Sequence, residues 1–210
     1  MPNYTAGLDL GQSNDYSALI VAEHWEQDTG ERSNGRSRLL DHFEVRLIRR
    51  WRGEAYQAVI DAVCGLLGAP DIRECVALRF DATGLGRVVK EMLHEAWHSD
   101  RLAHYPWGTS FTSGRLPGDG TVPKAHLMEN LEVLAQAGRL KVASTLKLAP
   151  ALREELVAFR GTRTATGYRK LEAEGGGHDD LVAALALAVW SPRRTGEPSR
   201  ISPDGSRWPR

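Results

Sequence analysis

Three short stretches of the sequence place aspartate at the end of an expected strand or at the start of an expected helix. They are Gly7-Leu8-Asp9-Leu10-Gly11, Arg79-Phe80-Asp81-Ala82-Thr83-Gly84 and Gly177-His178-Asp179-Asp180-Leu181. Carboxylates brought together from distant elements repel one another unless a cation lies between them. Hard divalent cations prefer oxygen ligands, so these residues predict a magnesium or manganese site.

Each aspartate also has an ordinary structural interpretation. Asp9 fits a turn carboxylate, and Asp81 fits a cap on the helix that follows it. Asp179 and Asp180 would complement the dipole of a helix. The combination is harder to explain, because two adjacent acids at a buried helix start are costly unless something positive faces them.

The helical period separates the roles of the last three candidates. Adjacent helix residues point about 100° apart, so Asp179 and Asp180 cannot face one ion equally. We expect Asp180 to point inward as a metal ligand. Asp179 would cap the helix, contact the ligands without touching the ion, or bind a second ion. His178 would orient a water, contact a phosphate or belong to the turn. Two ions about 4 Å apart can drive in-line attack on a phosphodiester, so the leading hypothesis is a metal-dependent nuclease.

Composition and charge indicate an ordinary globular protein. The 210 residues are 41% hydrophobic and 26% charged, with a formal net charge of zero, which argues against coating nucleic acid through bulk charge. No apolar run is long enough to span a membrane and the N-terminus does not read as a signal peptide, so we expect a cytoplasmic protein.

Cys64 and Cys75 are expected to be core thiols. Arginines at 46–52 and basic residues at 160–170 are expected to be a solvated rim or to track DNA phosphates.

Apolar periodicity predicts a sheet with helices. Strands are expected near residues 5–10, 17–24, 38–48, 75–80 and 104–107. Helices are expected near residues 55–66, 84–96, 127–138, 148–159 and 178–190. Polar or Gly- and Pro-rich loops are expected at residues 27–37 and 110–123, and a ribbon or an excursion at residues 161–174.

This order of elements predicts an α/β fold with a mixed sheet whose first three strands are antiparallel and whose later strands are added by crossovers. The first and fourth strands can then be neighbours, which would bring Asp9 and Asp81 to one edge. The final helix would place Asp179 and Asp180 beside them. We expect one domain over residues 1–192, followed by a flexible basic tail over residues 193–210.

Several of these motifs resemble the nuclease domain of phage large terminase subunits. The similar segments are Gly7-Leu8-Asp9, Asp15-Tyr16-Ser17-Ala18, Phe80-Asp81-Ala82-Thr83-Gly84-Leu85-Gly86, Thr112-Ser113-Gly114, Val122-Pro123-Lys124, Leu134 to Leu140, and His178-Asp179-Asp180-Leu181 with the apolar run to Ala188. The resemblance extends to Trp190.

The resemblance implies an RNase H-like fold and a two-metal endonuclease that cuts viral DNA during packaging and leaves a 3′-hydroxyl and a 5′-phosphate. It implies that Asp9 bridges two Mg²⁺ or Mn²⁺ ions, that Asp81 and Asp180 each complete one ion's shell, and that Asp179 and His178 act behind them or on the attacking water. Double-stranded DNA would be the substrate. The implied partners are a packaging ATPase, the small terminase subunit or the portal.

Terminase large subunits carry an ATPase before the nuclease, whereas no G-x-x-x-x-G-K-[ST] motif occurs in these 210 residues. We therefore expect the nuclease domain alone. Three alternatives stay open: a structure-selective nuclease such as a Holliday-junction resolvase, a non-catalytic binding module, and an actin-like ATP-binding protein suggested by Asp9-Leu10-Gly11.

Overall fold

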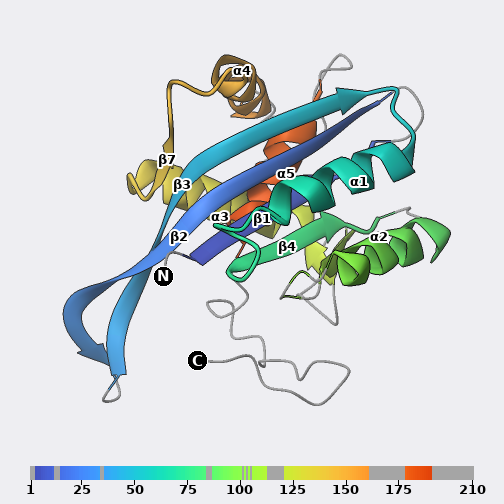
Figure 1. The fold of residues 1–210 in the computed structure, drawn as a ribbon. Coiled ribbons are helices and arrows are strands. Elements are labelled where there is room, and N and C mark those ends of the chain that lie inside the picture. Colours follow the sequence, from blue (N-terminus) through green and yellow to red (C-terminus); the bar gives the residue numbers. More distant parts are fainter. Residues whose placement is uncertain are drawn as a thin grey trace.

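A mixed sheet forms the centre of the fold, with helices on both faces (Figure 1). The computed structural model describes residues 3–11, 15–33, 36–83, 87–100, 102, 104, 106–112, 121–160 and 178–190. The strands are β1 (Asn3–Asp9), β2 (Tyr16–Ser33), β3 (Arg36–Arg52), β4 (Val76–Asp81), β5 (Trp107–Thr112), β6 (Thr121–Pro123) and β7 (Leu140–Val142). The helices are α1 (Tyr56–Leu67), α2 (Arg87–Ser99), α3 (Lys124–Gln136), α4 (Ala149–Arg160) and α5 (Asp180–Ala188).

The strand order is β6-β5-β4-β1-β2-β3-β7. β2 is antiparallel to both β1 and β3, whereas β4 is parallel to β1, and β5 and β6 continue in the parallel sense. The predicted fold class is therefore confirmed, including the three antiparallel strands at the start and the contact between the first and fourth strands.

Alternating side chains of the sheet build two separate cores. Ala18, Ile20 and Ala22 of β2 pack on the face that is covered by α3, α4 and α5. Leu19 and Val21 point to the other face and pack with α1 and α2. This alternation follows from the two-residue period of a strand. It places α5 in the middle of one face, where every residue from Asp180 to Ala188 is buried, as its apolar sequence predicts.

The loop predicted for residues 27–37 is wrong, because β2 and β3 continue through most of it as a two-stranded ribbon (Figure 1). Asp28 pairs with Leu39, and Arg32 pairs with Ser37 after a register shift that accommodates Gly30 at φ 76°. The Thr29 hydroxyl also donates to the Arg38 carbonyl at 3.0 Å. A ribbon that is exposed on both faces shows no apolar alternation, so its polar sequence resembles that of a loop.

Short strands were also misjudged. The strand expected at residues 104–107 begins only at Trp107, and the loop expected at residues 110–123 carries the end of β5 and all of β6. The three residues of β7 were not predicted, because they are too few to show a period. β7 instead depends on pairing with Phe43 to Val45 of β3.

The five predicted helices are present, with bounds that differ by up to three residues: α2 as described begins at Arg87 rather than near residue 84, and α3 begins at Lys124 rather than near residue 127. α4 has Pro150 in its first turn, and Gly138 follows α3 at φ 66°, a conformation that favours glycine. Cys64 is buried and Cys75 is partly buried, and both are free thiols. The described helices include none with the length and hydropathy required to cross a membrane. The segment at residues 161–174, the tail at residues 193–210 and Gly84 to Gly86 lie outside the described residues.

Candidate active site

Asp9 and Asp81 end two neighbouring parallel strands. Leu8 of β1 pairs with Phe80 of β4, so the next residue of each strand lies at the same edge of the sheet. Both carboxylates are partly buried, and Asp81 Oδ1 accepts the amide of Thr83 at 2.7 Å in a local turn. This bond closes a local turn and occupies one of the two carboxylate oxygens. It does not cap α2, which begins at Arg87, so the cap predicted as an alternative for Asp81 is not what the bond forms.

Gly7 brings α5 onto this edge. A Cβ atom at Gly7 would lie 1.9 Å from the carbonyl oxygen of Ala184 and 2.5 Å from the amide nitrogen of Ala188, so only glycine permits this approach. Asp9 lies two residues beyond Gly7, about 6.6 Å along the strand. Asp180 lies four residues before Ala184, about 6 Å along the helix. The carboxylates of Asp9 and Asp180 therefore lie at the same end of the contact between β1 and α5.

The two acids at the start of α5 differ in burial, as the helical period predicts. Asp180 is 6% exposed and is the first residue of the helix. Asp179 occupies the N-cap position without a side-chain capping bond, and its Oδ2 is instead 2.8 Å from Nζ of Lys124. His178 is exposed, with its ring packed edge-on against Tyr16 at 4.6 Å between centroids.

The carboxylates affect one another electrostatically. Burial is the main cause that raises the pKa of Asp9 to about 8. The next contributions come from three neighbouring carboxylates, those of Asp81, Asp179 and Asp180, while Lys124 acts in the opposite direction. The pKa of Asp81 is also raised, chiefly by burial, although its bonds with Thr83 oppose the shift. The acids of three separate elements therefore share one electrostatic environment.

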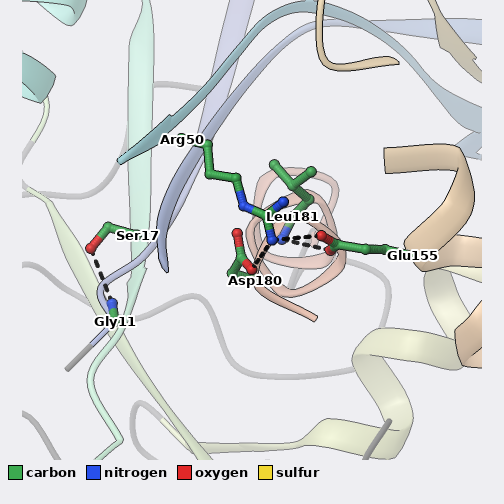
Figure 2. A network of polar contacts seen from close by, with 6 residues as sticks. All are labelled: Gly11, Ser17, Arg50, Glu155, Asp180 and Leu181. Atoms are coloured by element: carbon green, nitrogen blue, oxygen red, sulfur yellow. Dashed lines mark hydrogen bonds and ion pairs between the residues drawn. The ribbon is translucent and has the colours of Figure 1, made fainter. Parts of the chain in front are cut away.

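Two cations and one further acid belong to this environment and were not assigned to it from the sequence. Lys124, in a motif noted only for its resemblance, begins α3 and contacts Asp179. Arg50 lies in the arginine cluster of β3, and its Nη2 is 2.5 Å from Asp180 Oδ1 and 2.8 Å from Glu155 Oε1 (Figure 2). No pattern in the sequence pointed to Glu155, because its neighbours in α4 carry no motif.

Neighbouring groups act in opposite directions on the pKa of Glu155. Burial raises the pKa of Glu155 to about 7, and the nearby Asp180 adds to this shift. Arg50 and the amides of Leu181 and Val182 lower it again. Glu155 Oε2 accepts the amide of Leu181 at 3.1 Å, so this side chain closes the first turn of α5 where no capping side chain does so.

The arginine cluster of β3 therefore has mixed roles. Arg50 points inward to the acids, which fits neither a solvated rim nor phosphate tracking. Arg46 is exposed and pairs with Glu23 and Glu44 at 2.7 Å and 3.0 Å. Arg49 is exposed and donates to the carbonyl of Ile48. Residues 161–170 of the second basic cluster lie outside the described part of the chain.

The donor set fits a hard divalent cation. Within the described part of the chain, Asp180 Oδ2 is buried and has no hydrogen-bond partner, and Asp9 is an acid that burial and its neighbours hold toward the neutral form. A bound cation would satisfy both groups, since carboxylates are its preferred ligands. Among the described residues, no three His, Cys, Asp or Glu side chains already converge into a complete metal cage. Closing the site on an ion would therefore require side-chain adjustment, such as release of Asp179 by Lys124.

The sequence is similar to those of two phage large terminase subunits. The large terminase subunit of Thermus phage G20c is 28% identical over 185 residues, which cover 88% of this chain and 31% of that protein. The large terminase subunit of Thermus virus P23-45 is 28% identical over 190 residues with the same coverage. The chain thus spans about a third of the length of the curated relatives it matches. No family model matches it.

Solved structures share the fold. The large terminase nuclease of thermophilic phage G20c superposes with a TM-score of 0.57 at 23% identity, covering 89% of this chain and 81% of that one. The P22 large terminase nuclease domain gives 0.56 at 16% identity, with 89% and 79% covered. The human cytomegalovirus terminase nuclease domain, soaked with manganese, gives 0.51 at 10% identity, with 89% and 82% covered. The chain is a relative of the phage large terminase subunits, and it has the RNase H-like fold of their nuclease domains.

Proposed function

We propose that this chain is a metal-dependent endonuclease that hydrolyses phosphodiester bonds of double-stranded DNA in viral DNA packaging. The main support is the placement of Asp9, Asp81 and the Asp179–Asp180 pair from β1, β4 and α5 at one edge of the sheet. Proteins named large terminase subunits are similar along most of the chain, and terminase nuclease domains share its fold. Carboxylates in this arrangement are suited to hold two ions rather than to bind a substrate directly.

The roles of the side chains follow from their positions. Two divalent ions, Mg²⁺ or Mn²⁺, would activate a water and stabilise the attacking and leaving oxygens of the phosphodiester. Asp9, at the centre of the acidic group, would contact both ions. Asp81 and Asp180 would each contact one of them. Asp179 and His178 are more exposed, so they would act on the water or behind the ligands.

The substrate and the partners are part of the same proposal. Double-stranded DNA would lie across the edge of the sheet at which β1 and β4 end. A packaging ATPase, the small terminase subunit or the portal would deliver it in the host-cell cytoplasm. The nuclease domain would comprise residues 1–192, with residues 193–210 as a basic tail.

The first test is cleavage of supercoiled plasmid with Mn²⁺, with Mg²⁺ and with EDTA. We expect nicking or linearisation with metal only, and we expect Asp9→Asn to reduce it to the EDTA level because an amide cannot replace the bridging carboxylate. Asp61→Asn is the matched control, since Asp61 is an exposed acid of α1 on the opposite face of the sheet. Full activity of Asp9→Asn would refute the site assignment. Absence of both cleavage and Mn²⁺ binding in the wild type would refute the nuclease proposal.

A further inference from the structure

Asp180 belongs to a buried ionic network with Arg50 and Glu155. Arg50 of β3 bridges Asp180 of α5 and Glu155 of α4, with distances of 2.5 Å and 2.8 Å from its Nη2 atom (Figure 2). The three side chains are 15%, 8% and 10% exposed in the order Arg50, Asp180 and Glu155. Three elements that are distant in the sequence are thereby joined through one guanidinium group.

Stability alone gives no reason for this network. Removing three charges from water is expensive, and well-packed apolar side chains of similar volume often serve stability equally well or better. The trio also contains two carboxylates for one cation, and burial together with Asp180 raises the pKa of Glu155 to about 7. The charges of Arg50 and Glu155 are better explained by their effect on the position of Asp180.

The contacts determine how Asp180 is presented. Arg50 holds Oδ1, and Oδ2 is buried with no hydrogen-bond partner among the residues that the structure describes. The guanidinium of Arg50 also lies over the ring of Tyr16, with 3.8 Å between Cζ and the ring centroid, so its own orientation is restricted. Glu155 accepts the amide of Leu181 at 3.1 Å and so holds the backbone next to Asp180. One partner fixes the side chain and the other fixes the first turn of the helix.

We infer that Arg50 and Glu155 are positioning residues that hold Asp180 with its free oxygen available to a divalent ion. This inference rests on the proposed function. Neither residue contacts the ion or the DNA in this role. Residues that orient metal ligands typically contribute about 10- to 100-fold to metal affinity or activity, so the effect of disrupting the pair is measurable.

Arg50→Lys tests the first partner while the positive charge is kept. Lysine lacks the planar group that bridges two carboxylates and stacks on Tyr16. We expect the dissociation constant for Mn²⁺, measured by calorimetry on the DNA-free protein, to rise by about 10-fold or more, with slower metal-dependent cleavage. Arg49→Lys is the matched control, because Arg49 is the adjacent residue of β3, is exposed and contacts only the neighbouring carbonyl among its described bonds.

Glu155 tests the second partner by rescue. Glu155→Ala removes the acceptor for Leu181, and we expect weaker Mn²⁺ binding. Glu155→Gln keeps an acceptor oxygen, and we expect it to recover most of the affinity. This pair also covers the case in which Arg50→Lys does not fold.

The outcomes separate the positioning role from the nuclease proposal. If the wild type binds Mn²⁺ and cleaves DNA while Arg50→Lys and Glu155→Ala lower only the unfolding midpoint in EDTA, the network is structural and the inference is wrong. If the wild type neither binds Mn²⁺ nor cleaves, the proposed function fails and the inference fails with it.

Discussion

At the scale of residues, the site gathers more carboxylates than the two neighbouring cations can neutralise. Lys124 and Arg50 are the described cations in contact with it, through Asp179 and Asp180. Lys124 stands at the first position of α3, where the helix dipole disfavours a positive charge. Its contact with Asp179 offsets this unfavourable position. No pattern in the sequence indicated this contact, because the helix was expected to begin only near residue 127.

The raised pKa of Asp9 makes stability depend on pH. Between its ordinary value of 3.8 and about 8, Asp9 binds more protons in the folded than in the unfolded state. Stability should therefore fall as pH rises through this window, and the cost of the ionised side chain is fully present above it. In EDTA, Asp9→Asn should be more stable than the wild type by a few degrees at pH 8, since about 1 kcal/mol corresponds to roughly 2–4 °C for this size.

Thermal unfolding of both proteins in EDTA at pH 5 and at pH 8 checks this expectation. The advantage of Asp9→Asn should be smaller at pH 5 than at pH 8, and saturating Mn²⁺ should reduce it at pH 8 by stabilising the wild type. An advantage that is equal at the two pH values would show that Asp9 titrates normally.

At the scale of elements, the direct contact of β1 with α5 decides whether the acids meet. The backbone of α5 at Ala184 and Ala188 lies against Gly7 with no room for a side chain. The glycine was visible in the sequence within Gly7-Leu8-Asp9, and the alanine-rich run of α5 predicted burial. Which face of α5 meets which strand was not visible, because a helix that is apolar on all sides has no preferred face.

Gly7→Ala should therefore be destabilising and should reduce cleavage. The added Cβ meets backbone atoms, which cannot rotate away, so we expect a loss of about 1–3 kcal/mol or more in urea unfolding. α5 would be displaced together with Asp180. Gly65→Ala is the control, because a Cβ there meets nothing within 4 Å and alanine is favoured in a helix by up to about 1 kcal/mol. Equal effects of the two substitutions would contradict the close approach at Gly7.

At the scale of the whole molecule, the candidate site and the outer part of the β2–β3 hairpin are separate regions. The site lies at one edge of β1 and β4, whereas the outer part of the β2–β3 hairpin is a ribbon with exposed residues at 27–32 and 37–39. Its polar pairs, such as Arg38 with Glu31 at 2.7 Å, are exposed and contribute little to stability.

Shortening the ribbon should leave the fold and the site intact. Gln27 pairs with Leu40, so residues 28–39 can be replaced by Asn-Gly, which favours a two-residue hairpin turn. We expect an unfolding midpoint within a few degrees of the wild type and unchanged plasmid cleavage. The midpoint is measured by circular dichroism. A large loss of stability or of cleavage would show that the ribbon supports the domain or the DNA.

Periodicity was sufficient for the α/β class and for the five helices, because alternation and helical spacing are local properties of the chain. The candidate acids were inferred from their places at strand ends and at a helix start, and their assignment as site residues stays a prediction. Periodicity failed for the ribbon and for β7, whose pairing depends on partners and not on their own residues. The sequence also determined that Asp179 and Asp180 face different directions, since that follows from the helical period alone.

Only the tertiary structure decided which charges meet. Asp9, Arg50, Asp81, Lys124, Glu155 and Asp180 come from six different elements. Strand order and the approach of α5 over Gly7 bring these elements together, and neither is a local property of the sequence. The roles of Arg50 and Glu155 follow from that convergence, because an arginine on an exposed strand and one buried between two acids have the same sequence signature.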